Sequence, residues 1–128
     1  METDVDSAEL DFFIRDADKL PLYLRLRGVL TSLAPGCEVR VHKTTISFRA
    51  PRPFVYVGFS FRKHYPGVPD AHLMASFMSP QPCEHPLAIQ STLIRPGLYT
   101  IHALILPPGD LEDGLLSLIK QSLMIRNK

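Results

Sequence analysis

Residues 39–61, VRVHKTTISFRAPRPFVYVGFSF, indicate the fold of this chain. Over residues 39–41 and 46–48, apolar residues alternate with polar ones, which is typical of strands that bury one face. Residues 54–59 are almost all apolar and rich in β-formers, which favours a central strand. Because residues 42–45 contain no glycine or asparagine, we expect a bend or bulge in a long strand there, and not a tight primed hairpin.

Helical patterns lie on both sides of this strand region. Asp6 and Glu9 have the spacing of a capping box before a short apolar helix. Asp16 or Asp18 is placed to cap a second helix with a leucine-rich face. Near the other end of the chain, Asp110 is placed to cap a last helix with a similar apolar stripe.

Three further strands are predicted between these helices, at residues 71–78, 88–94 and 98–106. Proline-rich segments separate them, and the strand at 88–94 is expected at an edge. The order of helix, strands and helix predicts an α+β fold. We expect a mostly antiparallel sheet of five or six strands, with the N- and C-terminal helices packed on one face. At 128 residues, the chain is expected to form a single domain over 1–128, with 1–9 as an acidic tail or helix start.

The charge of the chain is unevenly distributed, although the net charge is only +1. Residues 1–19 carry seven acidic and two basic side chains, whereas residues 38–64 carry one acidic and six basic ones. This asymmetry indicates either an anionic partner or attraction between the two segments. The sequence contains no apolar run of membrane-spanning length, no basic signal-peptide start and too few cysteines for a disulfide framework. We therefore expect a cytoplasmic protein with two free thiols.

The alternation also predicts which residues occupy the sheet face that the helices leave open. If Ile46 and Phe48 face the helices, their polar neighbours point the other way, unless a bulge exchanges the faces. The candidate binding residues on this face and in the basic turns beside it are Arg40, His42, Lys43, Ser47, Arg49, Arg52, Tyr56, His72, Thr100 and His102. A face that mixes Arg, His and Tyr with the nearby Met74 and Met78 is typical of a surface that meets a partner.

Three interpretations of this face remain open. It is a solvated surface, a contact for a second copy or another protein, or a site for nucleic acid or an anionic small molecule. Nucleic acid is disfavoured because the chain has no Trp, a net charge of +1 and no recognisable RNA- or DNA-binding motif. The main hypothesis is a non-enzymatic module that acts through this face, as a homodimer or with a partner protein.

The sequence contains no pattern that assigns catalysis or a cofactor. The nucleophile elbow, the P-loop and the dinucleotide fingerprint are absent. His72, Cys83 and His85 lack the spacing of a zinc site. An enzyme that uses His72 or His102 as acid or base is the third alternative. Asp70 and His72 are two apart, so in a strand their side chains point the same way and can form an ion pair.

The run from His42 to Gly58, HKTTISFRAPRPFVYVG, resembles a domain family of unknown function. That family occurs in small bacterial proteins and as a C-terminal module of longer chains described as predicted transport or nuclease-like proteins. The shared pattern is L-x-P after a helix, here residues 33–35, then K-T-x-I-S-F, here residues 43–48, a basic turn, an aromatic strand and a closing helix. The resemblance spans residues 10–125, except 67–96, and implies a single α+β domain. It marks Lys43, Thr44, Ser47 and Phe48 as motif positions and implies no reaction.

Overall fold

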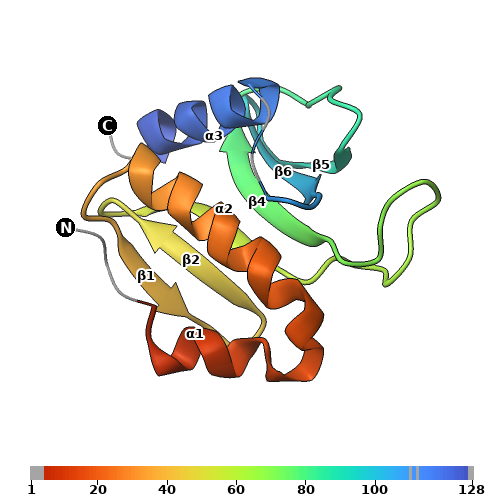
Figure 1. Cartoon of the computed structure of the whole chain (residues 1–128). Helices are drawn as coiled ribbons and strands as arrows, with labels where there is room; N and C mark the ends of the chain where they lie inside the picture. The colour runs from red at the N-terminus through yellow and green to blue at the C-terminus, as the bar shows by residue number, and fades with distance from the viewer. Residues whose placement is uncertain (1–4, 110, 112, 127–128) are drawn as a thin grey trace.

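The computed structural model describes residues 5–109, 111 and 113–126 and has an α+β fold, as predicted (Figure 1). Its helices are α1 (Ser7–Phe12), the 3-10 helix η1 (Ile14–Lys19), α2 (Leu20–Leu33) and α3 (Asp113–Arg126). Its strands are β1 (Glu38–Val41), β2 (Thr45–Arg49), β3 (Pro53–Gly58), β4 (Leu73–Ser79), β5 (Ala88–Arg95) and β6 (Leu98–Ile105).

The six strands form one sheet in the order β1-β2-β3-β4-β6-β5, and every neighbouring pair is antiparallel. The chain passes from β4 across β6 to reach β5, and then returns by a hairpin to place β6 next to β4. The two edges of the sheet are therefore β1 and β5. β5 is at an edge, as the sequence predicted for residues 88–94.

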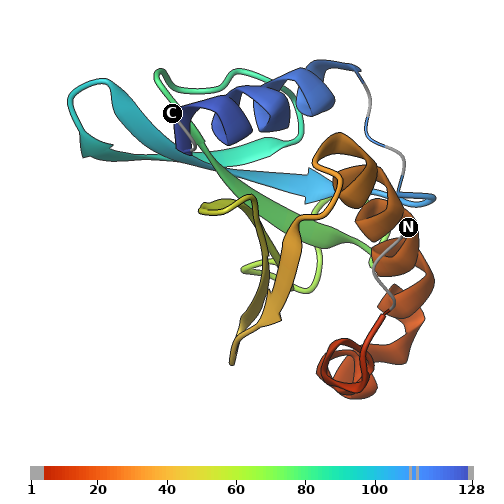
Figure 2. The same cartoon turned by 90° about the vertical axis from the view of Figure 1, so that its left-hand side faces the viewer.

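Helices α2 and α3 lie on the same face of the sheet, as Figures 1 and 2 show from two directions. α3 packs against β3 and β4, and the apolar side of α2 joins the same core. The alternating strand residues supply the other half of this core, among them Ile46, Phe48, Val55, Val57 and Ile101. The alternation seen in the sequence therefore gives the correct buried face.

Residues 42–45 do not form the predicted bend in one long strand. β1 and β2 pair as a hairpin instead, in which Val41 lies opposite Ile46 and the His42 N–H donates to the Thr45 carbonyl at 2.8 Å. No non-glycine residue in the described part of the chain has a positive φ. The hairpin turn is therefore not of the primed type, which agrees with the absence of glycine and asparagine from it.

The start of α2 also differs from the prediction. Neither Asp16 nor Asp18 caps this helix, since Lys19 is the N-cap residue and no side chain bonds to the free N–H groups. Pro21 occupies the first turn, where a missing N–H removes no helical bond. Residues 14–19 form η1, in which Asp16 pairs with Lys19. Asp110, the predicted cap of the last helix, lies outside the described residues.

The predicted capping box at α1 is confirmed, and its Glu9 has a second role. Asp6 Oδ1 accepts the Glu9 N–H and Glu9 Oε2 accepts the Asp6 N–H, both at 3.0 Å. The Glu9 carboxylate also accepts Arg27 Nε at 2.7 Å, Arg27 Nη2 at 3.3 Å and the Tyr23 hydroxyl. Glu9 is only 1% exposed, so one buried carboxylate joins α1 to α2.

Tyr23 and Arg27, which both bond to Glu9, keep their protons over a wide pH range. Burial and the hydrogen bond to Glu9 raise the pKa of Tyr23, so its hydroxyl remains a donor. Burial by itself lowers the pKa of Arg27, but its interactions with Glu9 and, to a smaller extent, with Tyr23 raise it above its ordinary value. Arg27 therefore stays charged, and the carboxylate of Glu9 is what compensates its charge.

We predict that Glu9→Gln destabilises the protein by about 3–5 kcal/mol, because the variant keeps the shape of the side chain but leaves Arg27 buried without a counter-charge. The double variant Glu9→Gln with Arg27→Met should recover part of this loss, since no buried charge remains. Urea unfolding of both variants measures the difference in the free energy of unfolding.

The control is Glu38→Gln, because Glu38 pairs with Arg40 at an exposed site on β1. Exposed pairs contribute roughly 0–1 kcal/mol, so this variant should unfold almost like the original chain. Equal losses in Glu9→Gln and Glu38→Gln would show that the buried pair does not hold α1 to α2.

Candidate functional site

Helices α2 and α3 lie on one face of the sheet (Figure 2), and the strand register places a row of side chains on the other face. From β1 to β5, the row consists of Arg40, Ser47, Tyr56, Ser76, His102 and Gln90. Each of these residues is the direct register partner of the next. Directly opposite residues in an antiparallel pair point to the same face with Cβ atoms roughly 4.5–5.5 Å apart, so the row is continuous.

Two histidine–serine pairs lie on either side of Tyr56 in this row. His42 Nε2 lies 2.9 Å from Ser47 Oγ, and the His42 ring is 6.4 Å from the Tyr56 ring, centre to centre. Ser76 Oγ lies 2.7 Å from His102 Nδ1. Burial lowers the pKa of His102, so its imidazole is neutral near pH 7. The row therefore consists of hydrogen-bonding groups, of which Ser47 is fully buried, and of Arg40, whose charge is paired with Glu38.

Apolar groups accompany the row on the same face. Met78 lies opposite Thr100, whose hydroxyl is 3.8 Å from the Met78 sulfur. Met74 also lies on this side, two residues before Ser76 on β4, but it is only 8% exposed. Phe61, in the segment after β3, packs edge-on against His102 with ring centres 5.1 Å apart and is 58% exposed. The face thus combines hydrogen-bonding and apolar groups in one area.

The structure brings six of the predicted binding residues to this face and its rim: Arg40, His42, Ser47, Tyr56, Thr100 and His102. The basic turn residues do not converge with them. Lys43 is exposed in the β1–β2 turn, Arg52 is exposed in the β2–β3 turn, and Arg49 lies at a register shift between β2 and β3. The strand region therefore does not form one basic pocket.

His72 is buried, so it does not contribute to the accessible surface for which it was a predicted binding residue. It precedes β4, is 1% exposed, and both ring nitrogens have partners, with Nε2 2.7 Å from Ser60 Oγ and Nδ1 2.7 Å from the Pro69 carbonyl. Asp70 does not pair with it. The Asp70 carboxylate lies 3.0 Å from His64 Nδ1, and this hydrogen bond lowers the pKa of Asp70. His72 therefore fixes the loop between β3 and β4.

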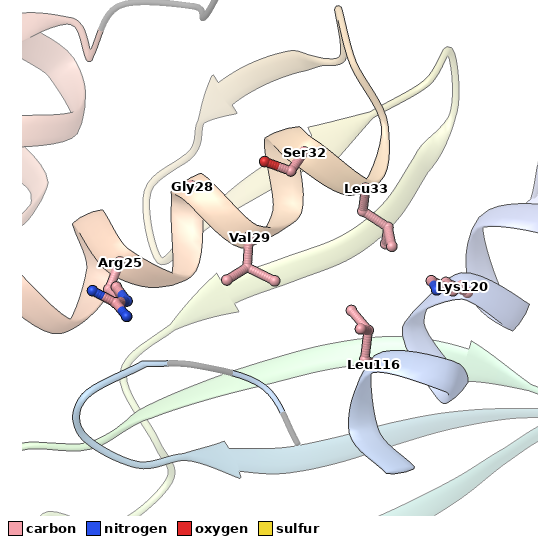
Figure 3. Close-up of a pocket in the computed structure, with 7 residues that line it drawn as sticks. All are labelled: Arg25, Gly28, Val29, Ser32, Leu33, Leu116 and Lys120. Atoms are coloured by element: carbon pink, nitrogen blue, oxygen red, sulfur yellow. The ribbon is translucent and has the colours of Figure 1, made fainter. Parts of the chain in front are cut away.

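Two of the hollows in the described part of the chain lie outside the row. One, of about 700 Å³, lies between α2 and α3, and Figure 3 shows Val29, Leu33 and Leu116 pointing into it. Its cationic residues, Arg25 and Lys120, lie at opposite ends, so no polar groups converge there. Its walls are mainly aliphatic and offer little to orient a polar ligand.

The second hollow, of about 470 Å³, lies between η1 and the segment after β3. Its basic lining residues are Arg15, Lys19, Arg62 and Lys63. Sequence reasoning missed this group, although Arg62 and Lys63 belong to the basic region at residues 38–64. Arg15 and Lys19 lie in the acidic N-terminal region, and only the fold brings them next to residues 62–63.

Comparison with known proteins gives no further assignment. No family model, curated protein or solved structure matches the chain. The resemblance of residues 42–58 to a domain family of unknown function therefore stays a prediction. In the part of the chain that the structure describes, no three His, Cys, Asp or Glu residues are grouped as metal ligands. None of the helices described is both long enough and apolar enough to cross a membrane.

We predict that His102 titrates with a midpoint below the ordinary value of 6.5, because its charged form loses hydration in the folded protein. The unfolded chain then binds the proton more readily, so the folded state loses stability as the pH falls through 6.5. NMR titration of the imidazole carbon protons measures the midpoint. Between pH 7 and a lower pH, the free energy of unfolding should decrease less for His102→Gln than for the original chain. A midpoint at or above 6.5 would contradict the prediction.

Proposed function

We propose that this chain is a non-enzymatic binding module whose open sheet face contacts another protein surface. The observation that supports it is the row of side chains from Arg40 to Gln90, which the register aligns across all six strands on the uncovered face. Tyrosine, methionine, arginine and exposed phenylalanine are enriched where proteins meet. These residue types lie together here, with hydrogen-bonding groups between them.

The chemistry of the face supports binding more than catalysis. Ser76 and His102 resemble a nucleophile and its base, but they lie on paired central strands whose backbone N–H groups serve the sheet ladder. Such a site offers few backbone donors to stabilise an oxyanion. No described carboxylate lies in an ion pair with His102 to orient its ring, as a triad requires.

The first partner to consider is a second copy of this chain. β5 is an eight-residue edge strand, and residues 88–94 carry no charge and no proline. Leu93 and Ile94 are more than half exposed, and Figure 2 shows the β5–β6 hairpin extending past α3. The opposite edge, β1, has four residues and is protected by the charges of Glu38 and Arg40.

Pairing of β5 with β5 across a two-fold axis would continue the open face from one copy into the next. The register of β5 with β6 shifts near both ends of the strand, so residues 90–93 form its regular part. This central part is the segment available for pairing. The proposal includes a cytoplasmic location, which the free thiols of Cys37 and Cys83 support.

We predict a dimer in light scattering after gel filtration, at both about 50 mM and about 500 mM salt, because apolar and main-chain contacts are weakly screened. Ile94→Lys, which places a charge on the exposed edge strand β5, should shift the protein towards the mass of one chain. The matched control is Met124→Lys, which changes an exposed apolar residue on α3. This control should leave the dimer intact.

A mass of one chain at both salt concentrations, up to about 0.5 mM protein, would exclude a second copy as the partner. An equal effect of Ile94→Lys and Met124→Lys would exclude β5 as the pairing edge. Thermal unfolding of each variant shows whether it keeps the fold.

A further inference from the structure

The hollow between η1 and residues 59–63 has an excess of positive charge among the described residues that line it. Four basic residues line it, and its acidic lining residue is Asp16. Asp16 pairs with Lys19. Among the described residues, no carboxylate forms an ion pair with Arg15, Arg62 or Lys63. Like charges held this close repel one another, so an anion in the hollow would be stabilised.

The arginines are held by aromatic rings and keep their hydrogen-bond donors available. The guanidinium carbon of Arg15 lies 5.8 Å from the centre of the Phe12 ring and 5.7 Å from that of Phe59. That of Arg62 lies 5.3 Å from the centre of the Tyr65 ring. Contacts with ring faces orient an arginine without occupying its N–H groups. Both groups are therefore prepared to form two parallel hydrogen bonds to an oxyanion.

Two contacts hold the wall formed by residues 59–63. Phe59 stacks on Phe12, which lies just before η1, with ring centres 5.3 Å apart and an angle of 10° between the rings. Ser60, which lies two residues before Arg62, bonds to the buried His72. Because these contacts position the backbone of this wall, little backbone entropy is lost when a ligand binds.

The hollow also offers an apolar surface next to its charges. Phe61 lines it and is 58% exposed, and its ring meets the edge of His102 on the open face. An exposed phenylalanine beside arginine groups suits a ligand that carries an aromatic ring and an anionic group. A volume of about 470 Å³ is in the range of pockets for small organic molecules.

We propose that this hollow binds a small phosphorylated aromatic molecule of the nucleoside monophosphate type. Arg15, Arg62 and Lys63 contact the phosphate, and the ring lies against Phe61. Phosphate fits better than a carboxylate because three unpaired cations match a group that carries close to two negative charges at neutral pH. The hollow shares Phe61 with the open face, but its cations lie outside the row, so the proposal does not depend on protein binding by that face.

The test is binding of AMP to the full chain, measured by calorimetry and by ¹⁵N NMR shifts, with inorganic phosphate and adenosine as the two partial ligands. AMP should bind about tenfold or more tightly than either, because it alone supplies both groups. Arg15→Gln and Arg62→Gln should each weaken AMP binding by about tenfold through the loss of charge-assisted hydrogen bonds. The NMR shifts should centre on residues 15–19 and 59–63.

The matched control is Arg95→Gln, which removes one exposed arginine at the end of β5, outside the hollow. It should leave AMP affinity unchanged. The proposal is overturned if AMP does not bind at about 5 mM. It is also overturned if Arg95→Gln weakens binding as much as Arg15→Gln, since the attraction is then only the general charge of the protein.

A further probe separates a small ligand from a nucleic acid. If a single-stranded oligonucleotide binds about 100-fold more tightly than AMP, with a steep dependence on salt, the hollow is part of a nucleic-acid surface and the small-molecule assignment is wrong. If AMP does not bind, the light-scattering test of the dimer is unaffected. If the protein has the mass of one chain, the AMP test of the hollow is unaffected. The two proposals can therefore fail separately.

Discussion

The buried contact between Glu9 and Arg27 is the interaction on which the arrangement of the N-terminal half depends. A charged arginine inside a protein requires a counter-charge at hydrogen-bond distance, and Glu9 supplies it from α1. Glu9 also completes the capping box with Asp6, so the start of α1 and its attachment to α2 rely on one carboxylate. The charge requirement leaves little freedom in how α1 lies against α2.

The same constraint positions the basic hollow. η1 is the chain between α1 and α2, and it carries Arg15 and Lys19. With α1 held at one end by Glu9 and α2 at the other, η1 lies against the segment that follows β3. Phe12 and Phe59 stack at this contact, and the positive charges from both segments face the same space. Phe61 then connects the hollow to the open face through its contact with His102.

Much of the open face could be predicted from the sequence. The period of two in residues 39–41 and 46–48 placed Arg40 and Ser47 on the side opposite Ile46 and Phe48, and strand pairing aligned them with Tyr56 and His102 as expected. The same parity rule assigned His72 to this face, but parity does not predict accessibility. His72 is 1% exposed, and its ring bonds to Ser60 and to the Pro69 carbonyl in the segment between β3 and β4.

What the sequence by itself determined is local: the period of each strand, the capping box at α1, and the face that each regular element buries. These depend on backbone geometry and on the spacing of apolar residues, both of which are properties of short segments. Only the tertiary structure decided which distant residues meet. The ion pair of Glu9 with Arg27 and the convergence of Arg15 with Arg62 arise when α1, η1 and the β3–β4 segment pack together. No spacing in the chain encodes that packing, because it follows from long-range burial and charge compensation.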